Sequence, residues 1–268
     1  MILLIATLLS VLSIGSLIFF LKPFIRRTLF IISIIAGVLF CSIIIWQVDS
    51  ASYLHTTIES RVSNRPIEVP TNGYIGSNKC QTCHIDKHAT WYDTYHRTMT
   101  QVATKNSIAT NVHNVSFIND NLKYILTEDD EKLWVSISDL KDAHSPTEKH
   151  EIVMTTGSHH YQVYWYETSS PRILDLLPYV YLISEKKWVP RYSVFLTPPQ
   201  DHYPEEYGRW NTICIRCHTT NGRPRQIEIG GTKFFDTQVS EFGISCEACH
   251  GPGQKHAKGM SNPLTRYL

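Results

Sequence analysis

Three copies of the pattern Cys-x-x-Cys-His limit what this chain can fold into more than any other feature, and they begin at Cys80, Cys214 and Cys246. The pattern is the signature for covalent attachment of a c-type haem: two thiols bond the porphyrin, and the histidine is the proximal iron ligand. Chance does not explain three matches in a chain with 7 cysteines and 13 histidines among 268 residues. The sequence therefore predicts three covalently bound haem c groups, held by Cys80, Cys83, His84, Cys214, Cys217, His218, Cys246, Cys249 and His250.

Other uses of paired cysteines fit this pattern less well. A redox-active dithiol or half of a zinc site needs Cys-x-x-Cys, but neither needs a histidine directly after it three times. A disulfide framework is unfavourable because cysteines so close in sequence rarely bridge. Haem attachment thus uses six of the cysteines, and Cys41, in an apolar run, is expected to be a small buried hydrophobic residue.

The N-terminal part contains two uncharged stretches, Ile2 to Leu21 and Thr28 to Val48, each about 20 residues long and so long enough to span a bilayer. The segment between them carries Lys22, Arg26 and Arg27, which the positive-inside rule places in the cytoplasm. The sequence predicts a two-helix hairpin in the cytoplasmic (inner) membrane, with the haem domain on the periplasmic or extracytoplasmic side. A cleaved signal peptide is the alternative, but a basic N-terminal region and a small-residue cleavage site are missing.

Composition divides the chain into three parts. Residues 1–48 form the predicted hairpin, the polar segment 49–73 is expected to be a linker, and residues 74–268 a trihaem cytochrome c domain. Alternating apolar and polar residues at about 112–200 predict a β-rich insert between the first two motifs. The predicted fold class is a multihaem cytochrome c, with mixed short helices around the haems, the β-rich insert and the N-terminal transmembrane hairpin.

The charge of the chain limits its partners. A net charge of +1 and 18% charged residues do not resemble a nucleic-acid-binding surface. Redox proteins and another membrane subunit are the expected partners, with membrane lipid around the two helices. Four arginines are candidate partners for haem propionates: Arg97, Arg172, Arg209 and Arg216.

The distal iron ligands decide between an electron carrier and a catalyst, because an iron with two histidines is saturated whereas an open iron can bind a substrate. Four further histidines are the better candidates: His96, His159, His160 and His256. On a strand, His159 and His160 would point to opposite faces, so only one of them would reach a haem. His202 is ambiguous, and His88 lies on the same helical face as His84, so it cannot reach the far side of the same haem.

Five segments of the sequence resemble a known family: Cys80-x-x-Cys-His with Trp91 and His96, Thr156-Gly-Ser-His-His-Tyr-Gln-Val-Tyr-Trp, Trp188-Val-Pro-Arg, Trp210-Asn-x-x-Cys-x-x-Cys-His-Thr-Thr-Asn, and Gly243-Ile-Ser-Cys-Glu-Ala-Cys-His-Gly-Pro-Gly-x-x-His. They look like the multihaem c-type cytochromes related to the tetrahaem cytochrome of ammonia oxidisers, whose relatives often carry tetratricopeptide repeats. The resemblance covers roughly Tyr74 to His256 and implies bis-histidine electron-transfer haems with His96 and His256 as distal ligands. The chain departs from the family in having three motifs rather than four, two predicted membrane helices and no such repeats.

The sequence thus predicts a membrane-anchored trihaem cytochrome that transfers electrons between redox partners, and it favours this function over an enzyme. The expected iron ligands are three proximal histidines, His84, His218 and His250, and three distal ones, His96, His160 and His256. Two alternatives stay open. One is an enzyme with one open haem iron that acts on a small nitrogen or sulfur compound, and the other is an anchoring electron-transfer subunit of a larger membrane complex.

Overall fold

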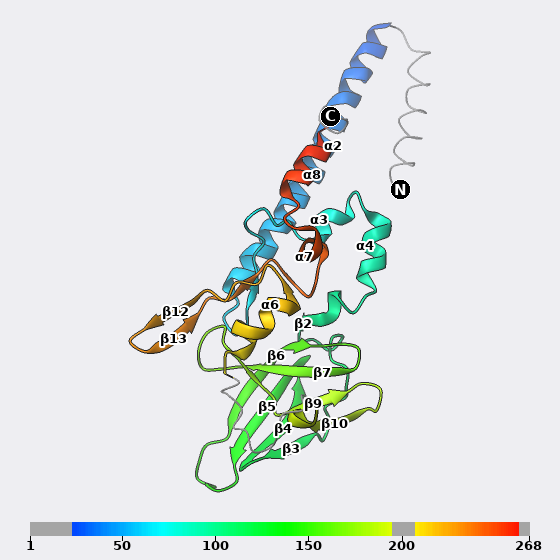
Figure 1. Cartoon of the computed structure of the whole chain (residues 1–268). Helices are drawn as coiled ribbons and strands as arrows, with labels where there is room; N and C mark the ends of the chain where they lie inside the picture. Colours follow the sequence, from blue (N-terminus) through cyan, green and yellow to red (C-terminus); the bar gives the residue numbers. More distant parts are fainter. Residues whose placement is uncertain (1–22, 195–206, 263–268) are drawn as a thin grey trace. The chain divides into compact units, whose positions relative to one another are not determined.

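The computed structural model describes residues 23–194 and 207–262, and the chain divides into two units, Met1–Ile58 and Glu59–Leu268. The described part of the first unit is a single helix, α2, which spans Pro23–Arg61 and ends in the second unit (Figure 1). Proline is favoured at the first position of a helix because its missing N–H would have no partner there. Cys41 is exposed on α2, so the expectation of a buried residue was wrong.

The predicted transmembrane hairpin is contradicted by the structure. Within residues 23–194 and 207–262, no helix is both long and apolar enough to cross a bilayer. The expected membrane helix Thr28 to Val48 is not a separate element, because α2 continues into polar sequence up to Arg61 with no glycine or proline to end it. Of the expected loop from Lys22 to Arg27, residues 23–27 are the start of α2, and the other expected helix, Ile2 to Leu21, lies outside the described residues. The predicted localisation, with two helices that span the cytoplasmic membrane, is therefore contradicted as well.

The second unit is built on one large antiparallel sheet. Its main path has the order β10-β9-β7-β6-β5-β4-β3, with β2 paired to β6 and β8 paired to β7. The strands are β2 Thr100–Val102, β3 Ser116–Asn119, β4 Leu122–Asp129, β5 Lys132–Asp139, β6 Glu148–Thr156, β7 Tyr161–Glu167, β8 Leu174–Leu176, β9 Tyr179–Leu182 and β10 Lys187–Pro190. Tight hairpins join β3 to β4 and β4 to β5. Asp120, Asp130 and Glu131 have positive φ in these turns, a conformation that two-residue hairpins require.

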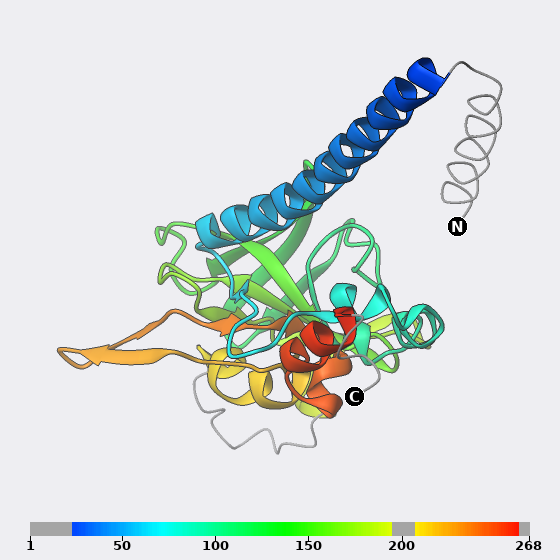
Figure 2. The same ribbon diagram turned by 90° about the horizontal axis from the view of Figure 1, so that it is seen from above.

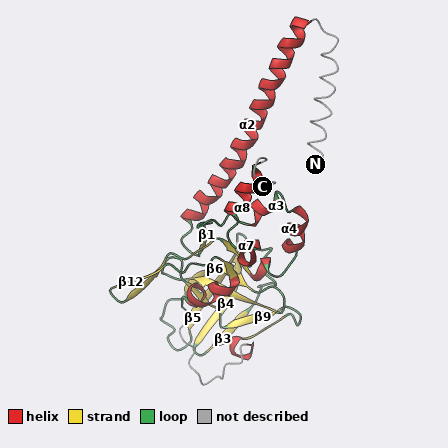
Figure 3. Ribbon diagram, turned by 45° about the horizontal axis from the view of Figure 1, so that its top comes forward, coloured by secondary structure: helices red, strands yellow, loops and turns green. Residues whose placement is uncertain are grey.

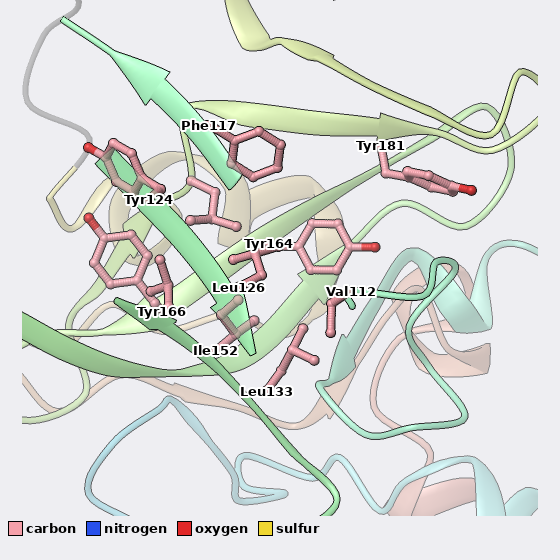
Figure 4. Packing of buried hydrophobic residues seen from close by; sticks show 11 residues of the cluster. Val112, Phe117, Tyr124, Leu126, Leu133, Ile152, Tyr164, Tyr166 and Tyr181 are labelled. Atoms are coloured by element: carbon pink, nitrogen blue, oxygen red, sulfur yellow. The ribbon is translucent and has the colours of Figure 1, made fainter. Parts of the chain in front are cut away.

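One face of the sheet packs on a cluster rich in tyrosine. Tyr124 of β4, Tyr164 and Tyr166 of β7, and Tyr181 of β9 meet there with aliphatic side chains such as Leu126 (Figure 4). Burial raises the pKa of Tyr124 to about 12 and raises those of Tyr164 and Tyr166 further. These phenols therefore stay protonated, and their main contribution is packing.

The other face of the same strands packs against residues around the second haem motif. Because neighbouring side chains of a strand point to opposite faces, Val163 and Trp165 of β7 join a second cluster rather than the tyrosines. This cluster also contains the fully buried Trp210 and Ile215, which flank the first cysteine of the second motif. The sheet is thus a rigid support for that motif.

Short helices, several of which carry the haem motifs, and small strand pairs complete the described part of the second unit (Figure 3). The helices are α3 Ser77–Gln81, α4 Ile85–Tyr92, η1 Arg97–Met99, α5 Arg191–Val194, η2 Trp210–Cys214, α6 Ile215–His218, α7 Cys246–His250 and α8 Gln254–Ser261. The pairs are β1 Ile67–Glu68 with β14 Gln238–Val239, β11 Thr219–Thr220 with β15 Glu241–Phe242, and β12 Gln226–Ile229 with β13 Thr232–Phe235. The β12–β13 hairpin projects from the second unit as an arm (Figure 2). The expected linker 49–73 holds the end of α2 and strand β1.

Candidate haem-binding sites

Each haem motif lies on a short helix or directly beside one. Cys80 is in α3 and the amides of Cys83 and His84 donate to its carbonyl at 3.2 and 2.9 Å, so the motif is wound into a helical turn. The second motif passes from the π-helical turn η2 into α6, and the third forms the whole of α7. All seven cysteines lie in the described residues, and none is in a disulfide. This winding suits thioether bonds to one porphyrin, since it brings both thiols of a motif close together.

The first and third motifs are neighbours. Burial raises the pKa of the Cys80 thiol to about 11, and the nearby Cys246 and Glu247 raise it further. The two thiols are within hydrogen-bonding reach of each other, although Cys80 and Cys246 are far apart in the sequence. Haems attached at these two cysteines would start from adjacent points.

The second and third motifs are held together as well. Thr220 follows the second motif and Ser245 precedes the third. The Thr220 hydroxyl donates to the Ser245 hydroxyl at 2.9 Å and accepts a hydrogen bond from the Ser245 amide at 2.9 Å. Strands β11 and β15 pair beside this contact. All three motifs are therefore tied to one framework.

His84 and His256 have the spacing of two ligands of one iron. Their ring centroids are 6.1 Å apart and their planes differ by 22°. Two imidazoles on opposite sides of a metal are separated by two metal–nitrogen bonds of about 2 Å and by about 1 Å from each nitrogen to its ring centre, in total about 6 Å. His256 lies on α8, which follows the third motif, and His84 belongs to the first. The residues present therefore fit a haem with two histidine ligands at the first motif.

A cavity of about 610 Å³ lies at the second motif. It is lined by Cys214, by His218 and by the turn 157–160 between β6 and β7. Most of its other lining residues are apolar or aromatic, with two arginines among them: Tyr95, Met99, Val163, Trp165, Leu176, Ile213, Arg191 and Arg209. A porphyrin is flat and apolar with two anionic propionates, so these walls and cations suit it.

His159 and His160 both line this cavity, which corrects the expectation of opposite strand faces. The two residues lie in the turn after β6 and before β7, not on a strand, so strand alternation does not apply to them. Their ring centroids are 4.1 Å apart, and His159 stacks on Tyr95 at 4.1 Å. His160 remains the predicted distal ligand, with His159 as the alternative.

The environment of His218 suits a metal ligand. Burial lowers its pKa, which favours the neutral imidazole that binds iron, and the Met99 backbone offsets this in part. The Met99 carbonyl, which lies near His218, is already bound by the Gly157 amide at 2.8 Å. Within the described ranges, Nδ1 of His218 is buried and has no hydrogen bond of good geometry.

His96 is tied to the third motif through its backbone. Its carbonyl accepts a hydrogen bond from the Ile244 amide at 2.9 Å, and the Trp91 indole donates to the Ile244 carbonyl at 2.9 Å. The His96 side chain is exposed, and its role as a distal ligand remains a prediction. His250 is exposed too, and in the part of the chain that the structure describes its ring has no aromatic neighbour. His202 lies outside the described residues.

We expect Gly243→Ala to destabilise the fold by about 1–3 kcal/mol. Gly243 has φ +73°, and a Cβ there would clash with the Arg97 carbonyl oxygen, so the contact with the His96 segment would open. Chemical unfolding measures the loss. Gly230→Ala is the matched control, because Gly230 also has positive φ (+59°) but has open space around it. Equal destabilisation by both variants would show that the close contact with Arg97 does not contribute to the loss of stability.

The sequence reasoning gave no role to Asn211, which the structure places at the second motif, and it set His88 aside. Asn211 is fully buried beside the second motif, donates to the Arg172 carbonyl at 2.7 Å and accepts from the Leu174 amide at 3.2 Å, so it fastens η2 to the sheet. The sequence offers only its place next to a motif as a signal. His88 is buried against Trp91, and its Nε2 has no hydrogen-bond partner among the described residues.

The candidate propionate partners differ in the structure. Arg209 lines the cavity at the second motif. Arg172 instead pairs with Asp236 and donates to the Val62 carbonyl, which makes it a structural residue. Arg97 donates to the Tyr92 carbonyl at 2.6 Å and lies over the Tyr92 ring.

Comparison with known proteins supports the haem assignment. The family model described as cytochrome c554 and c-prime matches residues 195–251, which hold the second and third motifs. A solved structure described as the outer cell wall cytochrome OcwA is similar with a TM-score of 0.43 and 20% sequence identity, over 71% of this chain and 34% of that chain. The chain thus spans about a third of the length of that protein. No curated protein matches the chain.

The repeated motifs and the family match point to one class of protein. They support a multihaem c-type cytochrome and, with it, a role in electron transfer. The narrower resemblance to the tetrahaem cytochrome of ammonia oxidisers remains a prediction.

Proposed function

We propose that this chain is a trihaem c-type cytochrome that transfers electrons between redox protein partners. The observation that carries the proposal is the pair His84 and His256, whose rings are 6.1 Å apart and nearly parallel. Two histidines on one iron leave no position for a substrate, and such an iron changes only its oxidation state. The nine motif residues would hold the three haems.

The framework around the motifs supports transfer from haem to haem. The Cys80 and Cys246 thiols are close to each other, and the Thr220–Ser245 contact joins the second motif to the third. Haems attached to motifs held this way would be clustered, with short edge-to-edge paths. The protein residues set the distances and the polarity, and when bound the haems supply the one-electron chemistry.

A specific observation favours a second candidate, an enzyme with one open iron that acts on a small nitrogen or sulfur compound. Unlike His84, which faces His256, His250 has no partner ring within the described ranges. If neither His96 nor a residue outside those ranges reaches this iron, one position would be free for a ligand. The alternatives differ in carbon monoxide binding, because only an open ferrous iron takes it up.

Intact mass and optical spectra of the purified protein test the proposal. We expect three covalently attached haem masses, low-spin spectra in both oxidation states and no carbon monoxide binding after reduction. Two haem masses or fewer would contradict the trihaem assignment. Binding of carbon monoxide at about one third of the haem would favour the enzyme.

Replacing the two cysteines of one motif tests whether that motif attaches one of the three haems. Cys80→Ala together with Cys83→Ala should remove one haem mass and leave the other two, because each motif holds its own porphyrin. Cys41→Ala is the control and should leave the mass of bound haem unchanged, since Cys41 lies outside the three motifs. A full haem complement in the double variant would show that the first motif does not attach haem.

A further inference from the structure

Glu247 occupies a place in the third motif that haem attachment does not use. It lies between Cys246 and Cys249 at one of the two variable positions, yet the residue is only 3% exposed. A carboxylate is rarely buried unless several donors satisfy it. Its surroundings therefore indicate a defined role.

Three backbone amides donate to this carboxylate. Oε2 accepts from Ile75 at 3.0 Å and from Gly76 at 2.8 Å, and Oε1 accepts from Gly253 at 2.7 Å and from Ile75 at 3.1 Å. Hydrogen bonds to an ionised acceptor are shorter and stronger than those between neutral groups. Both carboxylate oxygens are thus used, and Oε1 accepts from both segments of the chain.

The two segments are those that carry the His84–His256 pair. Ile75 and Gly76 lead directly into α3 and the first motif, whereas Gly253 lies in the turn that begins α8 and leads to His256. The segments also touch each other, because the Gln254 amide donates to the Gly73 carbonyl at 2.9 Å. A Cβ on Gly253 would lie 3.2 Å from Oε1 of Glu247, so the turn packs closely against the carboxylate.

We infer that Glu247 is a positioning residue, which holds the turn before His256 against the start of the first motif and so keeps His256 opposite His84. This inference rests on the proposed function, in which these two histidines bind one iron. The third motif would then have two roles: its cysteines attach one haem, and its Glu247 sets the distal ligand of another.

The hydrogen bonds at this site need a side chain with two accepting oxygens, which neither alanine nor glutamine supplies. Alanine at position 247 would leave the amides of Ile75, Gly76 and Gly253 without their acceptor. Glutamine keeps one oxygen, but its amide nitrogen would face an N–H donor and repel it. Both variants should release the turn, and His256 would spend part of its time away from the iron.

The test uses the full-length protein with its haems and carbon monoxide as the probe. Glu247→Gln and Glu247→Ala should bind carbon monoxide after reduction at more than half of the level seen in His256→Ala, and high-spin ferric signals should rise in parallel. Glu241→Gln is the matched control. Glu241 accepts from the Ser77 amide at 2.9 Å at the start of α3 but makes no hydrogen bond to the turn before His256, so its loss should create no carbon monoxide site.

Each outcome separates the inference from the proposed function. If His256→Ala itself binds no carbon monoxide, the ligand pair of the proposed function is wrong. If His256→Ala binds it and both Glu247 variants with three haems do not, Glu247 is structural only and the inference fails, whatever their stability. If both Glu247 variants lose the first haem, Glu247 acts in attachment rather than in ligation, which also overturns the inference.

Discussion

Replacing His256 by alanine should convert about one third of the haem iron from a low-spin to a high-spin form and should create one carbon monoxide site per protein. The expectation follows from the 6.1 Å between the ring centroids of His84 and His256, which fits two ligands of one iron. His84 would remain as the proximal ligand, and the opposite position would open. Electron paramagnetic resonance of the ferric protein and difference spectra of the carbon monoxide adduct measure the two effects.

His144→Ala is the control for this experiment. His144 is exposed in the loop between β5 and β6, so its loss should leave the spectra unchanged. The same substitution at His159 and at His160 shows which of the two serves the cavity at the second motif. An unchanged low-spin spectrum in His256→Ala would rule out the pairing with His84 and would shift the function toward an iron with another ligand.

The sequence alone identifies those parts of the site whose residues lie close together in the chain. Cys-x-x-Cys-His contains all its ligands within five positions, so the helical turns at Cys80, Cys214 and Cys246 follow from spacing alone. The partner of His84 could not be chosen in this way. His256 lies near the other end of the chain, and only the fold brings the two rings together. Glu247 was missed for the same reason, since two of its three donors, Ile75 and Gly76, lie far from it in the sequence.

The wrong expectations also have physical causes. The expectation that only one of His159 and His160 reaches a haem assumes a strand, but Gly157 has φ +88° and β6 ends before them, so both line one cavity. Near the end of the predicted β-rich insert, at about 112–200, the structure has the short helix α5, Arg191–Val194, rather than a strand. Hydropathy predicted a membrane helix that ends at Val48, but the residues from Val48 to Arg61 include no glycine or proline, and α2 continues through them to Arg61.

Glu68 makes the stability of the fold depend on pH. Its carboxylate on β1 accepts a hydrogen bond from the Phe242 amide at 2.6 Å. Burial raises its pKa from 4.5 to about 7. The bond from Phe242 and the charge of Arg65 act against this shift, and the carboxylates of Glu241 and Glu59 add to it. These are the charged groups that face Glu68 from the neighbouring elements.

The direction of the pH effect follows from proton binding. Because the folded protein binds this proton more tightly than the unfolded chain, the stabilisation is complete below about pH 4.5 and is lost as the pH rises to about 7. The loss is at most about 3 kcal/mol, since one pH unit corresponds to about 1.4 kcal/mol and the side chain keeps some contact with water. Stability should therefore fall across this window and level off above it.

Glu68→Gln should remove this pH dependence. Glutamine keeps an oxygen for the Phe242 amide, its NH₂ group can donate to the nearby carboxylates, and it carries no charge at any pH. We expect the variant to match the natural protein near pH 4.5 and to be more stable at pH 8 by up to about 3 kcal/mol, more than a hundredfold in the folding equilibrium. Urea unfolding at both pH values measures the difference. Glu228→Gln, on the exposed strand β12, should leave the pH profile unchanged. If the profile of Glu68→Gln has the same slope as that of the natural protein, Glu68 is not the group that titrates.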